Sequence, residues 1–235
     1  MIDFHCHILP GLDDGARHIE ESLEMALVLE GVGCTAVFAT PHVMLGAFDN
    51  YADAVRSAVT SLAQVFAREG IRLSLVPASE VYIDPTIPQL VRDRRVCCLG
   101  DSPFLLVELP HGELPFYTET VFFQVMLLGV TPVIAHPERN HTLRRDPEKL
   151  AGWVARGMVA QVNAGSLCGV YGRSVQAAAE NMCRRGLVAL VGSDAHSSSQ
   201  CELLGEAWER FQKLTRGTPE TSGVVKKLGG GLGLK

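Results

Sequence analysis

Short apolar runs alternate with longer amphipathic stretches along most of the chain. Seven runs are rich in Val, Leu, Ala and Phe and show little polar alternation: Ile2–His5, Thr35–Thr40, Leu73–Ala78, Phe104–Leu109, Thr131–His136, Val159–Asn163 and Leu187–Ser193. Such continuous apolar runs are typical of parallel strands that are covered on both faces, rather than of antiparallel strands with one wet face. We therefore predict seven parallel strands.

Between these runs, apolar side chains recur every three or four residues, which predicts helices that pack one face against a sheet. The stretches are Ile19–Glu30, Tyr51–Arg68, Glu119–Leu128, Asp146–Arg156, Arg173–Arg185 and Cys201–Leu214. Strand and helix units of about 34 residues predict an α/β fold, a (β/α)7 barrel over residues 1–214. A Gly-rich tail over residues 215–235 should be poorly ordered. An open doubly wound sheet is the alternative, but no Gly-rich phosphate loop follows the first strand.

Composition narrows the class of protein. Hydrophobic residues make up 47% of the 235 residues, and the formal net charge is −5, which argues against nucleic acid as a partner. No apolar run reaches the roughly 18 residues of a membrane span, and the N-terminus lacks the features of a signal peptide. The seven cysteines contain no CxxC pair, so we expect reduced, mostly buried thiols and a cytoplasmic protein.

Six of the seven apolar runs end in, or just before, residues whose side chains can bind metals. The candidates, including one aspartate just past the first run, are His5, His7, Asp14, His42, Glu80, Glu108, His136, Asp194 and His196. A βα barrel brings these strand ends to one rim, and residues i and i+2 of a strand point to the same face. Each residue alone could be structural, but together they favour a site for Mn²⁺, Zn²⁺, Fe or Co²⁺. Nine ligands imply two or three ions, with Glu80 as a bridge.

Such a site would support the hydrolysis of phosphate esters or amides, because it makes hydroxide available near neutral pH. Arg139 follows His136 closely and could hold phosphate oxygens, or it could pair with Glu138 or another carboxylate of the rim. No cysteine is followed six positions later by arginine, so the loop of the cysteine phosphatases is absent. The other three histidines lie in polar or loop contexts and should be at the surface: His18, His111 and His141.

The first sixteen residues, MIDFHCHILPGLDDGA, resemble the opening of the PHP-type bacterial protein-tyrosine phosphatases, which accompany capsule and exopolysaccharide loci. Later blocks of that family are matched in order, up to about residue 210, by Ala39–His42, Glu80, Leu106–Pro110, Ile134–Arg139, Gln161–Leu167 and Gly192–His196. The first block and the HPER sequence at His136–Arg139 are far more specific for this family than a single HxH pair.

This resemblance implies a distorted (β/α)7 barrel of PHP type with three ions, usually manganese. It implies one ion on His5, His7, Glu80 and Asp194, a second on Glu80, Glu108 and His136, and a third on Asp14, His42 and His196. A bridging hydroxide would attack phosphorus while Arg139 holds the phosphoryl oxygens. The implied substrate is phosphotyrosine, notably on the tail of a bacterial tyrosine kinase, and a homo-oligomer is also implied.

The chain departs from the family pattern in two places. Val43 stands where relatives often have a second histidine, and Ser197–Cys201 stands where they often carry Asn and then Arg-Pro. Substrate binding would then depend on Arg139, and Arg144 or Arg145 could contribute to it. Two other functions stay open: a PHP phosphatase acting on a small metabolite such as histidinol phosphate or on nucleic-acid ends, and a non-catalytic module that binds metal or a kinase tail.

Overall fold

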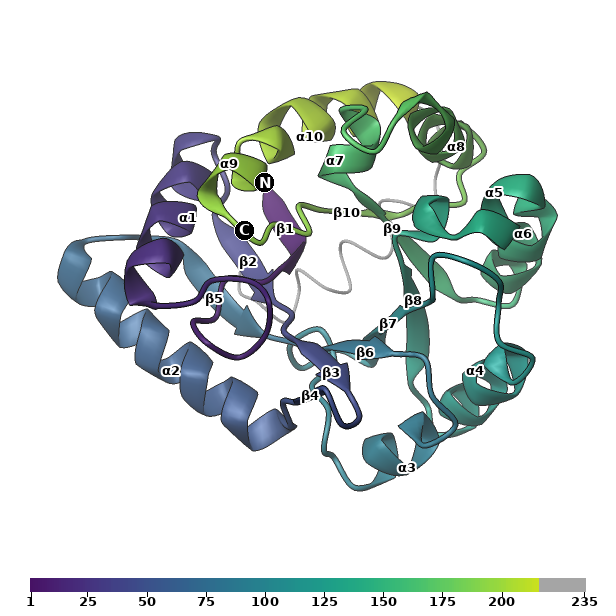
Figure 1. The fold of residues 1–235 in the computed structure, drawn as a ribbon, viewed down its shortest axis with the longest axis horizontal. Helices are drawn as coiled ribbons and strands as arrows, with labels where there is room; N and C mark the ends of the chain where they lie inside the picture. The colour runs from purple at the N-terminus through teal and green to yellow at the C-terminus, as the bar shows by residue number, and fades with distance from the viewer. Residues whose placement is uncertain (216–235) are drawn as a thin grey trace.

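The computed structural model describes residues 1–215, in which strands form a ring surrounded by helices (Figure 1). The strands are β1 Ile2–Cys6, β2 Ala36–Ala39, β3 His42–Met44, β4 Phe48–Asp49, β5 Ser74–Pro77, β6 Glu80–Tyr82, β7 Phe104–Glu108, β8 Thr131–Ala135, β9 Val159–Asn163 and β10 Leu190–Gly192. The helices are α1 Ile19–Gly31, α2 Ala52–Glu69, α3 Ile87–Arg92, α4 Thr118–Leu127, α5 His141–Arg145, α6 Pro147–Ala155, α7 Ala164–Leu167, α8 Arg173–Arg184, α9 Ser198–Cys201 and α10 Leu203–Leu214, with a 3-10 turn at Pro137–Arg139.

The predicted tail, apart from its first residue, lies outside the described residues. All six predicted helices are present. The chain also forms α3, α5, α7 and α9, which have four to six residues each and are too short to show a helical repeat in the sequence. Within residues 1–215, no helix is both long and apolar enough to cross a membrane.

The ring is an all-parallel barrel with one antiparallel addition. In one sheet β2 lies between β1 and β5, and in the other the order runs from β10 through β9, β8, β7 and β6 to β3, with β4 antiparallel at the edge. The first and last strands close the ring, since Asp194 N donates to His5 O at 2.7 Å and His7 N donates to Ala195 O at 3.0 Å. The predicted distorted (β/α)7 barrel is confirmed.

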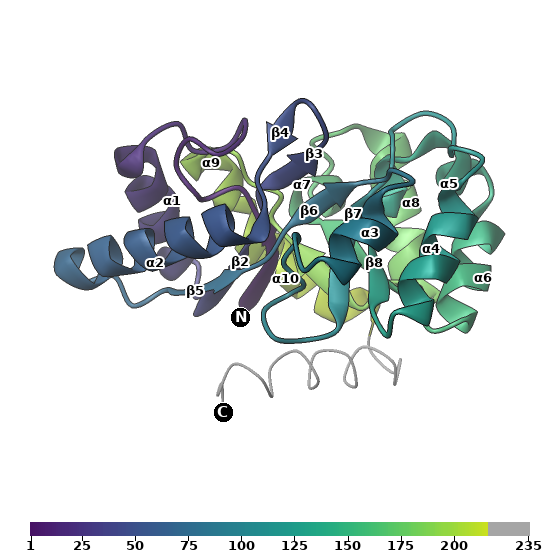
Figure 2. The same cartoon turned by 90° about the horizontal axis from the view of Figure 1, so that it is seen from below.

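Two of the seven predicted strands are each broken into two. The second breaks between β2 and β3 at Pro41, which has no N–H to donate to a strand ladder. The third breaks between β5 and β6, where Ser79 N donates to Cys97 O instead of to a neighbouring strand. These breaks carry β3 and β6 to the upper end of the barrel, and the β3–β4 hairpin projects there, at the end opposite the N-terminus (Figure 2).

The barrel interior has an apolar floor beneath a polar upper end. Its inner cluster includes Phe4 and Phe38, whose stacked rings lie 5.3 Å apart, and Leu106. A second and larger cluster lies between the strands and the helices and contains Cys6. All seven cysteines are free and none is exposed, as expected.

Candidate metal centre

All nine predicted ligand residues meet at the upper end of the barrel. Eight of them form three groups, and within each group the donor atoms lie within 4.8 Å of one another: His5, His7, Glu80 and Asp194; His42, Glu80 and Glu108; and His7, Asp14, His42 and His196. The ninth, His136, belongs to none of these groups but has its Nε2 3.1 Å from Oε1 of Glu80. The prediction that residues from both ends of the chain share one rim is therefore correct in its geometry.

The most buried group joins β1, β6 and the segment after β10. Nε2 of His5 and Nε2 of His7 lie 3.1 Å apart, which fits the expectation that an HxH pair in a strand aims at one point. Oε2 of Glu80 lies 3.1 Å from the first nitrogen and 3.3 Å from the second, and Oδ1 of Asp194 lies 3.3 Å from both. This grouping coincides with the first ion implied by the family resemblance.

Glu80 links this group to the next one. Its Oε2 lies 3.0 Å from Nδ1 of His42, and its Oε1 lies 3.1 Å from Nε2 of His136. Glu108 is farther away, at 3.7 Å from His42 and 3.9 Å from His136. The second group thus gathers around His42, whereas the resemblance implied His136, which lies on the other oxygen of Glu80.

The third group lies nearer to solvent. Oδ1 of Asp14 lies 3.3 Å from Nε2 of His196 and 3.6 Å from Nε2 of His42. The rings of His7 and His196 stack, with centroids 4.0 Å apart. Asp14 is 60% exposed, more than any other of the nine residues.

The donor set fits metal ions. Ligands about 2.0–2.2 Å from an ion lie roughly 3.0–3.5 Å from one another, which is the spacing seen here. Oε2 of Glu80 and Nδ1 of His42 are buried without a hydrogen bond, although they lie only 3.0 Å apart. Buried polar atoms normally have a partner, and a cation placed between these two would provide it.

The charges of the protein groups also favour cations. Burial opposes charge on His5, but the carboxylates of Glu80 and Asp194 outweigh burial and raise its pKa to about 9. The same histidines hold the pKa of Glu80 and of Asp194 below their ordinary values despite burial. Burial and the nearby charge of Glu80 raise the pKa of Glu108. The site is thus built from groups that each need an opposite charge close by.

A second set of side chains orients the imidazoles. Nδ1 of His5 lies 2.9 Å from Oε1 of Gln161, whose Nε2 donates to Asn163, and Nδ1 of His7 lies 2.7 Å from Oδ2 of Asp13. These partners leave Nε2 of both rings facing the cluster. Gln161 and Asn163 were not predicted as site residues, although two amide side chains in an otherwise apolar strand were a usable signal.

Because Gln161 orients His5, its loss should weaken metal binding. We expect Gln161→Leu, which keeps the bulk but removes the amide, to lower the affinity for Mn²⁺ by roughly 10- to 100-fold. The measurement is a competition titration against a chelating dye, with Gln64→Leu on the exposed face of α2 as the control. An unchanged affinity would show that His5 keeps its orientation without the amide.

Close packing and backbone strain hold the ligands in place. A Cβ on Gly192 would lie 2.4 Å from Cβ of His5, so only glycine lets β10 approach β1 this closely. His136 and Asp194 have φ values of 30° and 52°, a region that residues other than glycine rarely adopt. Val133 and Ala135 face the inner cluster, so His136 would point outward in a regular strand, and its left-handed backbone turns it inward.

Arg139 lies beside the buried group. Its NH1 nitrogen donates to Oδ2 of Asp194 at 2.9 Å, and its guanidinium lies 4.6 Å from the centre of the Tyr171 ring. Oδ2 of Asp194 also accepts from Asn163 at 2.5 Å. Of the two roles predicted for Arg139, an ion pair with a rim carboxylate is present. Its other N–H donors have no hydrogen-bond partner among residues 1–215, so they remain available to an anion.

The structure places the other two arginines that were expected to bind substrate, and the two departures from the family pattern. Arg144 donates to the carbonyls of Glu138 and Arg139, so it supports the turn that carries Arg139. Arg145 is exposed at the end of α5. Val43 is buried in β3 and pairs with Val81 of β6. Ser197 precedes the short helix α9.

Two adjoining cavities open at this end of the barrel. The inner cavity, of about 200 Å³, is lined by Asp14, His42, Glu108, His111, His136, Arg139, Asp194 and His196. The outer one, of about 310 Å³, is lined by Asp14, His42, Met44, Phe48, Tyr82, Glu108, Pro110 and His111. His111 is exposed, as expected. It also lines both cavities and packs edge-on against His136, which was not predicted.

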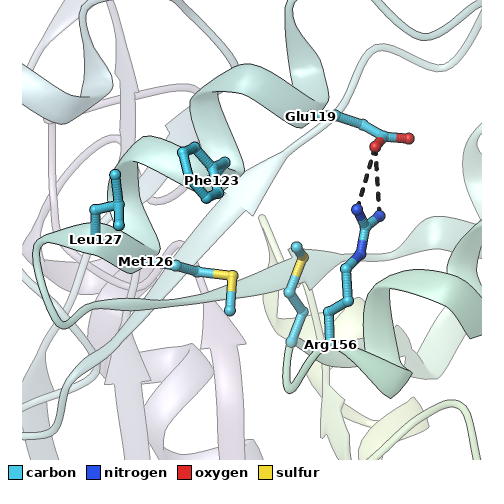
Figure 3. Close-up of a pocket in the computed structure, with 6 residues that line it drawn as sticks. Glu119, Phe123, Met126, Leu127 and Arg156 are labelled. Atoms are coloured by element: carbon cyan, nitrogen blue, oxygen red, sulfur yellow. Dashed lines mark hydrogen bonds and ion pairs between the residues drawn. The ribbon is translucent and has the colours of Figure 1, made fainter.

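Another pocket, of about 210 Å³, lies away from the metal-ligand residues, along α4 (Figure 3). Phe123, Met126 and Leu127 form its apolar wall, and Glu119 pairs with Arg156 at its edge. None of the nine predicted ligands lines it, so it takes no part in the metal centre.

Several known proteins are similar to this chain in sequence. The profile of the family described as "Capsular polysaccharide synthesis, CpsB/CapC" matches residues 1–213. The chain is 38% identical to tyrosine-protein phosphatase YwqE of Bacillus subtilis over 197 residues, 84% of this chain and 78% of that protein. It is 25% identical to tyrosine-protein phosphatase CpsB of Streptococcus agalactiae serotype III (strain NEM316) over 202 residues, 84% of this chain and 83% of that protein.

A solved structure gives the same result. It comes from work on YwqE of Bacillus subtilis and CpsB of Streptococcus pneumoniae, described as unique metal-dependent tyrosine phosphatases. It matches with a TM-score of 0.89 and 33% identity over 100% of this chain and 95% of that one. The family resemblance in the sequence is confirmed, and the chain belongs to the CpsB/CapC family of capsular polysaccharide synthesis.

Proposed function

We propose that this chain is a metal-dependent tyrosine phosphatase and that its nine clustered side chains hold two or three Mn²⁺ ions. The proposed substrate is phosphotyrosine on a protein, such as the tail of a bacterial tyrosine kinase of polysaccharide synthesis. The observation that carries the proposal is the position of Glu80, which is fully buried and contacts three histidines through Oε2 and a fourth through Oε1. Family membership supports the link with polysaccharide synthesis.

Bound ions at such a site would neutralise phosphate oxygens and lower the pKa of water. The protein groups do the rest. The donors of Arg139 that face the inner cavity would hold the phosphoryl oxygens, and Asp194 would keep the guanidinium in position. Gln161 and Asp13 would fix the ring orientation of His5 and His7. No thiol is needed, and burial raises the pKa of the Cys6 thiol, which keeps it neutral.

The test is phosphate release by the manganese-loaded protein from a phosphotyrosyl peptide, histidinol phosphate and 3′-phosphorylated single-stranded DNA. We expect the peptide to have the highest kcat/KM. A preference for histidinol phosphate or DNA would show that the protein acts on another class of substrate. If no ester is hydrolysed, the result would favour a non-catalytic binding module. Metal analysis of the same samples identifies and counts the ions.

Arg139→Ala should lower kcat/KM for the peptide by about 100-fold, because charge-assisted hydrogen bonds to the phosphoryl group are lost. Metal content should stay unchanged, since Asp194 keeps its bond from Asn163. Arg156→Ala, which breaks an exposed pair with Glu119, is the matched control and should retain activity. Loss of metal in Arg139→Ala would show instead that the arginine supports the ligands.

A further inference from the structure

The outer cavity differs in chemistry from the inner one. Both cavities share Asp14, His42, Glu108 and His111, so they adjoin. The inner cavity adds charged groups and imidazoles, whereas the residues that the outer cavity adds are Met44, Phe48, Tyr82 and Pro110. A ligand that fills both cavities would therefore carry a compact anion at one end and an apolar group at the other.

The β3–β4 hairpin builds one wall of the outer cavity. Met44 pairs with Phe48 across its two strands, and Gly46, with φ at 77°, makes the tight turn between them. The Phe48 ring stacks on the ring of His42, with centroids 5.7 Å apart and planes at 21°. This apolar wall thus begins directly at a predicted metal ligand and extends outward to the projecting hairpin (Figure 2).

The rest of the apolar lining comes from the neighbouring strands and the residues that follow them. Tyr82 of β6 pairs in register with Glu108 of β7, and Pro110 follows two residues later. Phe48 and Tyr82 are only partly buried, and both line the cavity. A cavity of about 150 Å³ is enough to hold benzene, and the 310 Å³ here has room for one substituted ring.

We propose that the outer cavity is the subsite for the aryl ring of the substrate, and that Phe48 and Tyr82 determine the preference for aryl over alkyl phosphates. The inference rests on the proposed function, because the phosphoryl group of the same substrate must occupy the inner cavity. The side chain of phosphotyrosine has both parts in the right order: a tetrahedral dianion attached directly to a flat ring. Offset or edge-on contacts with Phe48 and Tyr82 would stabilise that ring.

The test measures binding, so it does not depend on turnover. The manganese-loaded protein is titrated calorimetrically with phenylphosphonate and with methylphosphonate, which share the anionic group and differ in the ring. Wild type should prefer phenylphosphonate. Phe48→Ala should lower the affinity for phenylphosphonate by about tenfold and leave the affinity for methylphosphonate unchanged. Phe48→Tyr, which keeps the ring, should restore the preference, and Phe123→Ala in the pocket of Figure 3 should have no effect.

The outcomes separate the two proposals. Equal binding of the two phosphonates by wild type, absence of binding, or an equal loss for both in Phe48→Ala would overturn the aryl subsite even if the phosphotyrosyl peptide is hydrolysed. Failure to hydrolyse that peptide, with the ring preference intact, would instead overturn the proposed function. Thermal unfolding of each variant verifies that the hairpin substitution leaves the fold intact.

Discussion

Glu80→Gln should abolish most metal binding and lower turnover of the phosphotyrosyl peptide by at least about 100-fold, because a metal site contributes several kcal/mol to the transition state. The substitution keeps the shape of the side chain but removes its negative charge. It also places an amide donor or a neutral oxygen at positions that now face His5, His7, His42 and His136. No other carboxylate of the cluster contacts so many of the proposed ligands.

The control for this experiment is Glu113→Gln. Glu113 is exposed and binds Thr142 and His141 outside the cluster, so its loss of charge should leave metal content and turnover unchanged. Inductively coupled plasma mass spectrometry of both variants, prepared in parallel, gives the number of ions per chain. If Glu80→Gln keeps all its ions and near wild-type turnover, the bridging role assigned to Glu80 is wrong.

Much of the fold and the clustering of the nine residues could be predicted from the sequence, for a simple reason. Buried parallel strands leave uninterrupted apolar runs, and a barrel brings the ends of all its strands to one rim. A histidine or carboxylate at the end of such a run, such as His5 or Glu80, is therefore placed by the strand that precedes it. At these residues, the position in the sequence is enough to predict the position in the barrel.

Other features depend on contacts that no local pattern records. His136 faces the site only because its backbone adopts φ of 30°, and alternation along β8 would have turned it away. The β3–β4 hairpin has strands of three and two residues, too short for a periodic signal. His111 reaches the cavities through a loop whose path is set by tertiary packing, for example by His141 N donating to its carbonyl.

How the donors divide among ions also could not be predicted from spacing. His42 lies within reach of Glu80, Glu108 and Asp14, so it can serve either of two groups. The sequence places it at a strand end but does not set the angle of its ring. Its ring stacks on Phe48, which comes from the unpredicted hairpin.

Metal affinity should depend steeply on pH, because ions and protons compete for the same imidazoles. In protein stripped of metal by a chelator, the pKa of His5 is raised to about 9 and that of His7 lies well above its usual value, since acidic neighbours outweigh burial. Both rings are then protonated near neutral pH and must lose their protons to bind a cation. The apparent affinity for Mn²⁺ should rise about tenfold per pH unit for each proton displaced, between about pH 6 and 8.

The thermal stability of the stripped protein should change in the opposite direction. The raised pKa of His5 stabilises the fold fully below its ordinary value of 6.5, and this contribution is lost as the pH rises through about 9. The lowered pKa of Asp194 gives a contribution that is present above its ordinary value of 3.8 and is lost on acidification. The increase in Tm caused by Mn²⁺ should therefore grow from about pH 6 to pH 8.

Calorimetry of Mn²⁺ binding in two buffers of different ionisation enthalpy counts the released protons. The control is His141→Ala, which removes an exposed imidazole outside the cluster and should leave that number unchanged. A pH-independent affinity with no proton release would mean that His5 and His7 do not bind the ions.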